Sequence, residues 1–236
     1  MKRGLRALCL GLAAGLSCTA FAQTQNLAEE QENFGNSLKW IGIVDAQLVL
    51  NQTCVFPPGE ELPARARCVV LQPAPAQTFW EELEVASVRI PGGTLKTVIC
   101  PVFLHNTSYG MSNPTAIDHN GRLTHRTFIV LESEALQGVN HLVTGEPFNG
   151  KLEISWGNRT FARRFTPGDD AGEVLQFTRA CNAGIDSNGL VEGSGVPEAV
   201  VKEIFKKPLV IHLSFRGNAR LVDFGNLAFS MRVMGN

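Results

Sequence analysis

The sequence predicts an all-β protein, an antiparallel β-sandwich of the immunoglobulin-like or jelly-roll-like kind, with one short helix near the C-terminus. Short segments rich in Val, Ile, Leu, Phe and Thr follow one another along most of the 236 residues and are separated by Gly, Pro and Asn. That succession is typical of sandwiches and barrels. Two late segments also alternate apolar with polar residues, as half-buried strands do.

The N-terminus has the features of a secretory signal peptide over residues 1–22. Three basic residues precede a short apolar stretch, which an Ala-Phe-Ala cleavage sequence follows. Cleavage of a lipoprotein signal before Cys18 is the alternative. Residues 23–37 are polar and acidic, so we expect a flexible arm ahead of a sandwich domain at residues 38–236. The chain is therefore expected to be exported, to the periplasm, the outer surface or the medium.

The mature chain gives no sign of nucleic-acid binding or of a membrane span. Loss of the leader removes three basic and no acidic residues, which takes the formal net charge from −1 to −4. No later segment has the roughly 20 apolar residues of a membrane helix. The Gly-x-Ser-x-Gly motif of serine hydrolases is absent, and we expect no cofactor.

The expected elements run from residue 38 to the C-terminus. Asn120-Gly121 and Gly157-Asn158 are hairpin-turn signals. An apolar stripe with a basic end predicts a helix at Pro197–Lys207. Residues 184–195 are rich in Gly, so we expect a flexible segment there, which is also the candidate boundary of a second subdomain. We expect strands at residues 38–50, 82–90, 95–104, 124–132, 150–156, 159–165, 208–215 and 227–233.

Strict alternation marks the last two strands. Leu209, Ile211, Leu213 and Phe215 fall on one face of the first, and the second repeats the pattern over Leu227–Met234. Strand addition at a sheet edge is a common binding mode of β-proteins. The terminal strand is our candidate edge for such an interaction.

Four cysteines remain in the mature chain: Cys54, Cys68, Cys100 and Cys181. An even number in an exported chain predicts two disulfides, with three connectivities open. The loop between Cys54 and Cys68 favours pairing these two, which leaves Cys100 to pair with Cys181.

Cys100, His105 and Met111 follow one another at spacings that superficially resemble the ligand loop of the copper-binding cupredoxins. Such a site needs two histidines and a thiolate in one plane, and the resemblance implies a histidine upstream of the cysteine. No histidine precedes Cys100. We therefore expect Cys100 to lie in a strand that ends near Leu104, and His105–Met111 to form an exposed loop.

Asp118 and His125 are candidates for an acid/base pair, with His105 as a further member. If Asn120-Gly121 forms a two-residue turn, Asp118 and His125 share one face of a hairpin diagonally. This is the alternative to a non-catalytic function: an exported hydrolase or lyase with a shallow site.

Two further segments are candidate binding sites. Arg159, Phe161 and Arg163 interleave charge and aromatic rings on one strand, a combination that suits an anionic sugar or a peptide. Asp186, Asn188 and Glu192 carry oxygen ligands at spacings that partly match a calcium loop.

The sequence favours an exported, non-catalytic β-sandwich protein of a bacterial envelope or cell surface. Its expected roles are surface-structure assembly, as in pilus-like fibres, adhesion or ligand binding. We expect protein partners, with a glycan as the other candidate, and enzymatic activity is the less favoured outcome.

Overall fold

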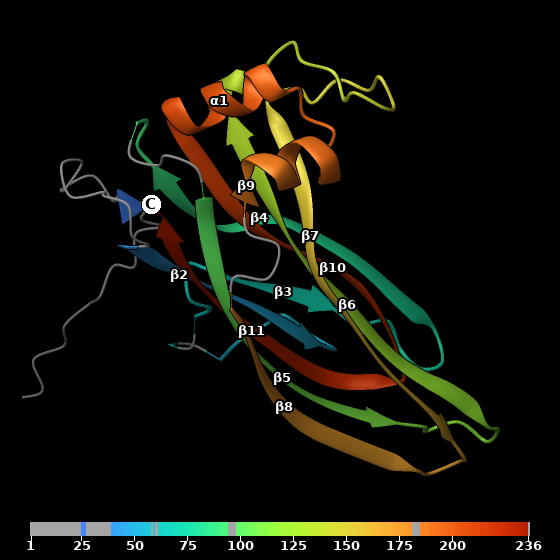
Figure 1. Ribbon diagram of the computed structural model, residues 1–236. Coiled ribbons are helices and arrows are strands. Elements are labelled where there is room, and N and C mark those ends of the chain that lie inside the picture. Colours follow the sequence, from blue (N-terminus) through green and yellow to red (C-terminus); the bar gives the residue numbers. More distant parts are fainter. Residues whose placement is uncertain are drawn as a thin grey trace, which may run out of the picture.

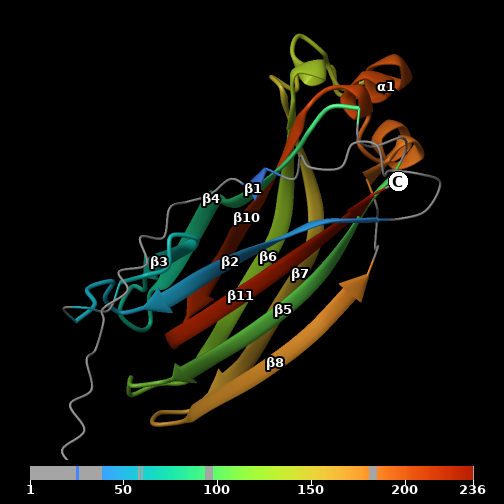
Figure 2. The ribbon, with the colours of Figure 1, turned by 90° about the vertical axis from the view of Figure 1, so that its left-hand side faces the viewer.

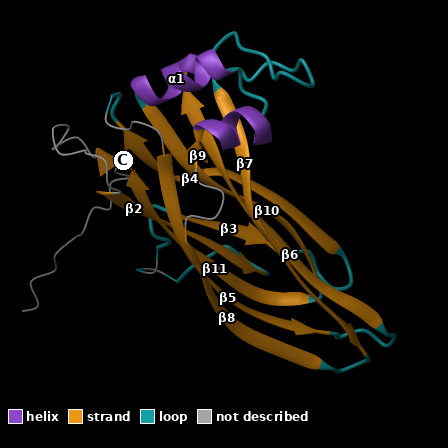
Figure 3. Cartoon of the chain, in the orientation of Figure 1, coloured by secondary structure: helices purple, strands orange, loops and turns teal. Residues whose placement is uncertain are grey.

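The computed structural model describes residues 25–26, 39–57, 59, 61–93, 98–180 and 185–235. They form two packed sheets, with short helical elements gathered at one end (Figures 1 and 3). The predicted all-β sandwich with one short helix near the C-terminus is confirmed. No helix in these ranges is long and apolar enough to cross a membrane.

The first sheet has the strand order β1-β4-β10-β6-β7. All pairs are antiparallel except the two-residue contact of β1 with β4. The strands are β1 (Gln25–Asn26), β4 (Gln77–Ile90), β6 (His119–Ser133), β7 (Lys151–Phe165) and β10 (Leu209–Arg220).

The second sheet has the order β3-β2-β11-β5-β8, and β9 pairs with one end of β5. Here only β2 and β3 are parallel. Figure 2 shows β8 as the outermost strand of this sheet. The strands are β2 (Lys39–Asn51), β3 (Ala66–Val70), β5 (Val98–Ser112), β8 (Asp170–Ala180), β9 (Ile185–Asp186) and β11 (Val222–Gly235).

The core lies between the sheets, and the predicted alternation of β10 and β11 supplies much of it. Leu209, Ile211, Leu213 and Phe215 of β10 are at most 2% exposed, as the alternation requires. Each fully buried side chain of this size stabilises the fold by roughly 1.5–3 kcal/mol.

Three helical elements lie among the described residues: the turn η2 (Glu134–Leu136), the π-helical turn η3 (Gly189–Gly193) and the helix α1 (Glu198–Lys206). The predicted stripe of α1 is buried at Val201, Ile204 and Phe205. Part of the predicted flexible segment 184–195 is ordered, since β9 pairs with β5 and η3 buries Leu190.

Both predicted hairpin turns are wrong, because the two glycines serve other purposes. Gly121 lies inside β6, where an added Cβ would come 2.6 Å from the Phe165 ring, so glycine permits close packing there. Gly157 lies inside β7, beside the register shift between Thr127 and Phe128. A glycine within a strand often marks such a bulge.

The terminal strand is not an edge. Strand β11 pairs with β2 on one side and with β5 on the other along nearly its whole length. The prediction that Leu227–Met234 accepts a partner strand is therefore wrong, because both sets of its backbone hydrogen-bonding groups are already used.

The predicted exposed loop at His105–Met111 is also wrong. Strand β5 continues to Ser112, and His105, Thr107, Tyr109 and Met111 all point into the core. Two of these inward positions, His105 and Thr107, are polar. The alternation of apolar and polar residues that marks a half-buried strand is therefore not visible in the sequence beyond Leu104.

The predicted Cys54–Cys68 disulfide is present, with a Cα–Cα distance of 5.8 Å. The predicted Cys100–Cys181 pairing and the predicted signal peptide involve residues outside the described ranges, so both stay predictions. Of the predicted flexible arm, only Gln25–Asn26 is described, as strand β1.

Candidate functional site

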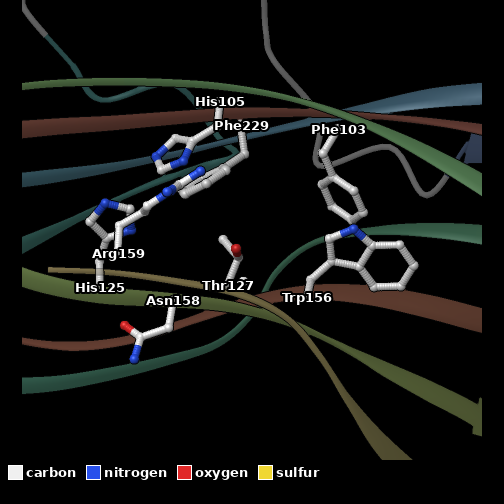
Figure 4. A pocket seen from close by; sticks show the side chains of 9 residues that line it. Phe103, His105, His125, Thr127, Trp156, Asn158, Arg159 and Phe229 are labelled. Carbon is white, nitrogen blue, oxygen red and sulfur yellow. The ribbon is translucent and has the colours of Figure 1, made fainter. Parts of the chain in front are cut away.

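Two histidines from opposite sheets meet inside the sandwich. His105 comes from β5 and His125 from β6, and their ring centroids lie 4.7 Å apart with the planes nearly perpendicular, at 88° (Figure 4). Both residues are almost fully buried, at 3% and 2% exposure. The His105 ring also stacks on Phe229 of β11 at 3.9 Å. The two imidazoles therefore form part of the core.

The polar atoms of this pair are only partly satisfied. His105 Nε2 lies 2.7 Å from Thr107 Oγ1, within hydrogen-bond distance. His125 Nε2 is buried and has no hydrogen-bond partner among the described residues. A buried polar atom left in this state costs about 1–3 kcal/mol, so the position of His125 requires an explanation.

A small pocket adjoins the histidines, and we call it the histidine pocket. Its volume is about 30 Å³, enough for a water molecule. The indole Nε1 of Trp156, also buried, has no described hydrogen-bond partner either. Figure 4 shows Arg159 beside the two histidines. The lining residues are Phe103, His105, His125, Thr127, Trp156, Gly157, Asn158, Arg159 and Phe229.

Burial keeps both imidazoles uncharged near neutral pH. Desolvation lowers the pKa of His105 to about 2, with His125 and the Arg159 guanidinium contributing further. Desolvation and then Arg159 lower the pKa of His125 to about 4. Arg159 therefore gives the pocket a positive potential, and no carboxylate lines it among the described residues.

A second, larger pocket lies further along β7, where the two sheets leave an open side. It has a volume of about 510 Å³ and is lined by residues of β5, β7 and the start of β8. Phe161 separates it from the histidine pocket, since its ring centroid lies 4.9 Å from that of Tyr109 and 6.0 Å from that of His125. We call this open side, between residues 157–165 of β7 and 170–175 of β8, the β7/β8 seam.

The structure brings together only two members of the proposed Asp118, His125 and His105 site. Asp118 forms an ion pair with Arg164 at 2.8 Å. Asp118 directly precedes β6, and His125 lies seven residues further along the chain, within that strand. The two residues are therefore roughly 20 Å apart. The expected diagonal pair does not form, because the turn on which it depended is absent.

The copper-type spacing does not produce a copper site. His105 and Met111 both point inward from β5, but they lie six residues apart on one strand. At about 3.3 Å per residue the separation is roughly 20 Å. One metal cannot bind both side chains.

The residues of the predicted calcium loop lie around η3. Asp186 accepts a hydrogen bond from the Gly189 backbone N–H at 2.7 Å, which fixes the start of the helical turn. Asn188 and Glu192 are exposed. Asp186 therefore already has a structural role, and calcium binding stays a prediction.

Arg159, Phe161 and Arg163 lie on β7 as predicted, and the structure divides them between the two pockets. Arg159 lines the histidine pocket, and Phe161 and Arg163 line the seam. The Arg163 guanidinium carbon lies 5.4 Å from the centroid of the Phe165 ring, a cation–π arrangement.

Sequence reasoning missed a polar cluster on the outer face of the first sheet. Ligand atoms of Glu84, Glu132 and His212 lie within 4.8 Å of one another. Lys151 forms ion pairs with both carboxylates, so an ammonium already supplies positive charge there. Only the strand register brings these positions together, and no sequence motif signals it.

No protein-family model, characterised protein or solved structure matches the chain significantly.

Proposed function

We propose that the chain is an exported, non-catalytic β-sandwich protein of a bacterial envelope or cell surface that binds an extended segment of a partner protein along the β7/β8 seam. Export is supported by the leader-like composition of residues 1–22. The single observation that carries the binding proposal is the pair of free strand edges flanking an aromatic-lined pocket.

The edges are the first part of the argument. Among the described residues, β7 pairs only with β6, and β8 pairs only with β5. Each therefore offers a row of backbone N–H and C=O groups to a further strand, and proteins generally protect such edges unless they use them. Val174 on β8 is 81% exposed, so this edge also carries an apolar side chain in solvent.

The pocket gives the chemistry of the partner segment. Tyr109 and Phe161 present aromatic surface between the strands, and Arg163 adds a positive charge beside them. A strand that docks here directs every second side chain inward. The geometry favours a segment with apolar residues at alternate positions and one acidic residue among them.

The catalytic alternative has less support. The histidine pair is present, but no Asp or Glu lines its pocket among the described residues. Burial also lowers the pKa of His125 to about 4 and that of His105 to about 2, whereas an efficient general base has a pKa near the working pH.

Selection from a phage-displayed library of random peptides, followed by calorimetry with the purified protein, tests the proposal. Val174→Pro and Leu175→Pro supply the discriminating variants, because consecutive amides on a strand point to opposite edges. One of the two prolines therefore removes a backbone hydrogen bond to β5. The other, the free-edge variant, removes only an N–H group on the side of β8 that faces away from β5. We expect the free-edge variant to keep its melting temperature and lose peptide affinity at least tenfold.

The scrambled peptide is the matched control. Hydrogen exchange with the peptide bound should slow at alternate amides of β8, because a new ladder protects only the outward-facing set. Failure to select any peptide, or unchanged affinity in both folded proline variants, would contradict the proposal.

A further inference from the structure

The histidine pocket has hydrogen-bonding groups that the protein itself leaves unused. Trp156 Nε1 and His125 Nε2 have no hydrogen-bond partner among the described residues. Both side chains are nevertheless buried, with exposed fractions of 7% and 2%. Buried polar groups in native proteins are nearly always paired with protein, water or a ligand. Both groups line the same small pocket, which points to a group that occupies it.

The chemistry of these groups restricts the occupant. An indole N–H and a guanidinium are donors only, and a neutral imidazole donates from Nε2 in one of its tautomers. Trp156 therefore requires an acceptor, and the Arg159 guanidinium in the same lining favours an acceptor that carries negative charge. With a guanidinium and no carboxylate in the described lining, the pocket favours an anion, and Arg159 would repel a metal cation.

The size and the walls restrict it further. Phe103 and Phe229 supply flat apolar surface, and the Phe103 ring lies 4.6 Å from that of Trp156. The volume of about 30 Å³ exceeds the roughly 10–15 Å³ that one water molecule needs, which leaves room for a head of two or three heavy atoms. The rest of such a ligand must extend toward solvent past Asn158 and Arg159, the exposed residues of the lining.

We propose that the histidine pocket binds a single carboxylate group. Trp156 Nε1 and the Arg159 guanidinium donate hydrogen bonds to its oxygens, and His125 donates from Nε2. The carboxylate belongs either to a free monocarboxylic acid or to an Asp or Glu side chain on a segment docked in the adjacent seam. The site itself does not depend on the strand-addition proposal, because a free acid would also fill it.

Titration with acetate and with benzoate, followed by the indole N–H signals in ¹H–¹⁵N NMR spectra, tests the free acid. Trp156→Phe identifies the Trp156 signal among the three tryptophans. We expect this signal to shift and saturate with a carboxylate, and to stay unchanged with benzamide, the neutral isostere of benzoate. Arg159→Gln should weaken binding by roughly ten- to a hundredfold, as expected for a lost charge-assisted hydrogen bond.

Arg164→Gln is the matched control. Arg164 is an exposed arginine on the same strand whose described ion pair is with Asp118, outside the pocket. Its replacement should leave carboxylate binding unchanged. An equal loss in this variant would mean that general surface charge, and not the pocket, binds the anion, and would overturn the proposal.

A peptide selected for the seam tests the second source. Replacing its acidic residue with the amide should weaken binding to the wild-type protein and have no effect in Arg159→Gln. This result assigns the carboxylate to the partner, and a saturable benzoate shift assigns it to a free acid. If neither appears, only water fills the pocket and the proposal is overturned. Failure of peptide selection alone leaves the benzoate result to decide.

Discussion

Acidification should destabilise the protein well above the pH at which its carboxylates titrate, because of the buried histidine pair. His105 and His125 have pKa values of about 2 and about 4 in the folded protein, against about 6.5 in an unfolded chain. The unfolded state therefore binds more protons as the pH falls through 6.5. Stability is lost from about pH 6.5 downward, until the pH falls below the folded pKa of each histidine.

The size of the effect follows from these values. At about pH 5 the unfolded histidines are almost fully protonated and the folded ones almost fully neutral. Linkage then gives a loss of roughly 2 kcal/mol for His125 and roughly 2 kcal/mol for His105, relative to about pH 8. A combined loss of about 4 kcal/mol is a large part of the 5–15 kcal/mol typical of folded domains.

Urea unfolding at several pH values between about 8 and 5 measures this loss as a change in the free energy of unfolding. His125→Gln should remove about half of the pH dependence, whatever it does to stability at neutral pH. Arg164→Gln, on the same sheet but outside the pocket, should keep the full dependence. Desolvation raises the pKa of Glu82, which acts in the opposite direction near pH 5, so the difference between variant and wild type is the decisive quantity. An equal pH dependence of the unfolding free energy in His125→Gln and in the wild type would refute the reasoning.

Two further perturbations test the packing of the sandwich. The double variant Cys54→Ala, Cys68→Ala should lose about 3 kcal/mol of unfolding free energy, since the disulfide closes a loop with a sequence separation of 14. Wild-type stability that a reductant leaves unchanged would contradict this prediction. Gly217→Ala places a Cβ 2.3 Å from the backbone of β6 and 2.4 Å from Trp80, and should cost about 1–3 kcal/mol. Gly157→Ala is the control, since its nearest contact would be at 4.0 Å, and equal melting temperatures of the two glycine variants would show that the close approach is unimportant.

The parts of the fold that were predictable are those in which local sequence and burial agree. Strand β10 has apolar residues at every inward position from Leu209 to Phe215, and helix α1 has a matching stripe. The failures have the opposite cause. Strand β5 turns His105 and Thr107 inward, so polarity there does not report exposure, and Gly121 serves packing where its dipeptide suggests a turn.

The candidate site was predictable as residues but not as an arrangement. The sequence suggested His105 and His125 together only as companions of Asp118 in an acid/base site, and it suggested Arg159 in a separate binding strand. Their meeting depends on which strands are neighbours and in which register: His105 is aligned with Phe229 in one sheet, and His125 with Arg159 in the other. Register between strands far apart in sequence has no local signal, so only the folded structure groups these side chains.

The unsatisfied atoms around the histidine pair carry weight only because they converge. The indole of Trp80 is also buried without a described partner, so one such atom does not by itself indicate a ligand. At the histidine pocket an unpartnered indole and an unpartnered imidazole face one small space, in a core where apolar side chains would avoid the desolvation cost, and a guanidinium lines the same space. A sequence that departs from good packing at several neighbouring positions usually does so at a functional site. The pocket also lies beside the edge of β7 that no described strand covers, so the proposed carboxylate would enter it from the same side on which a partner strand would dock.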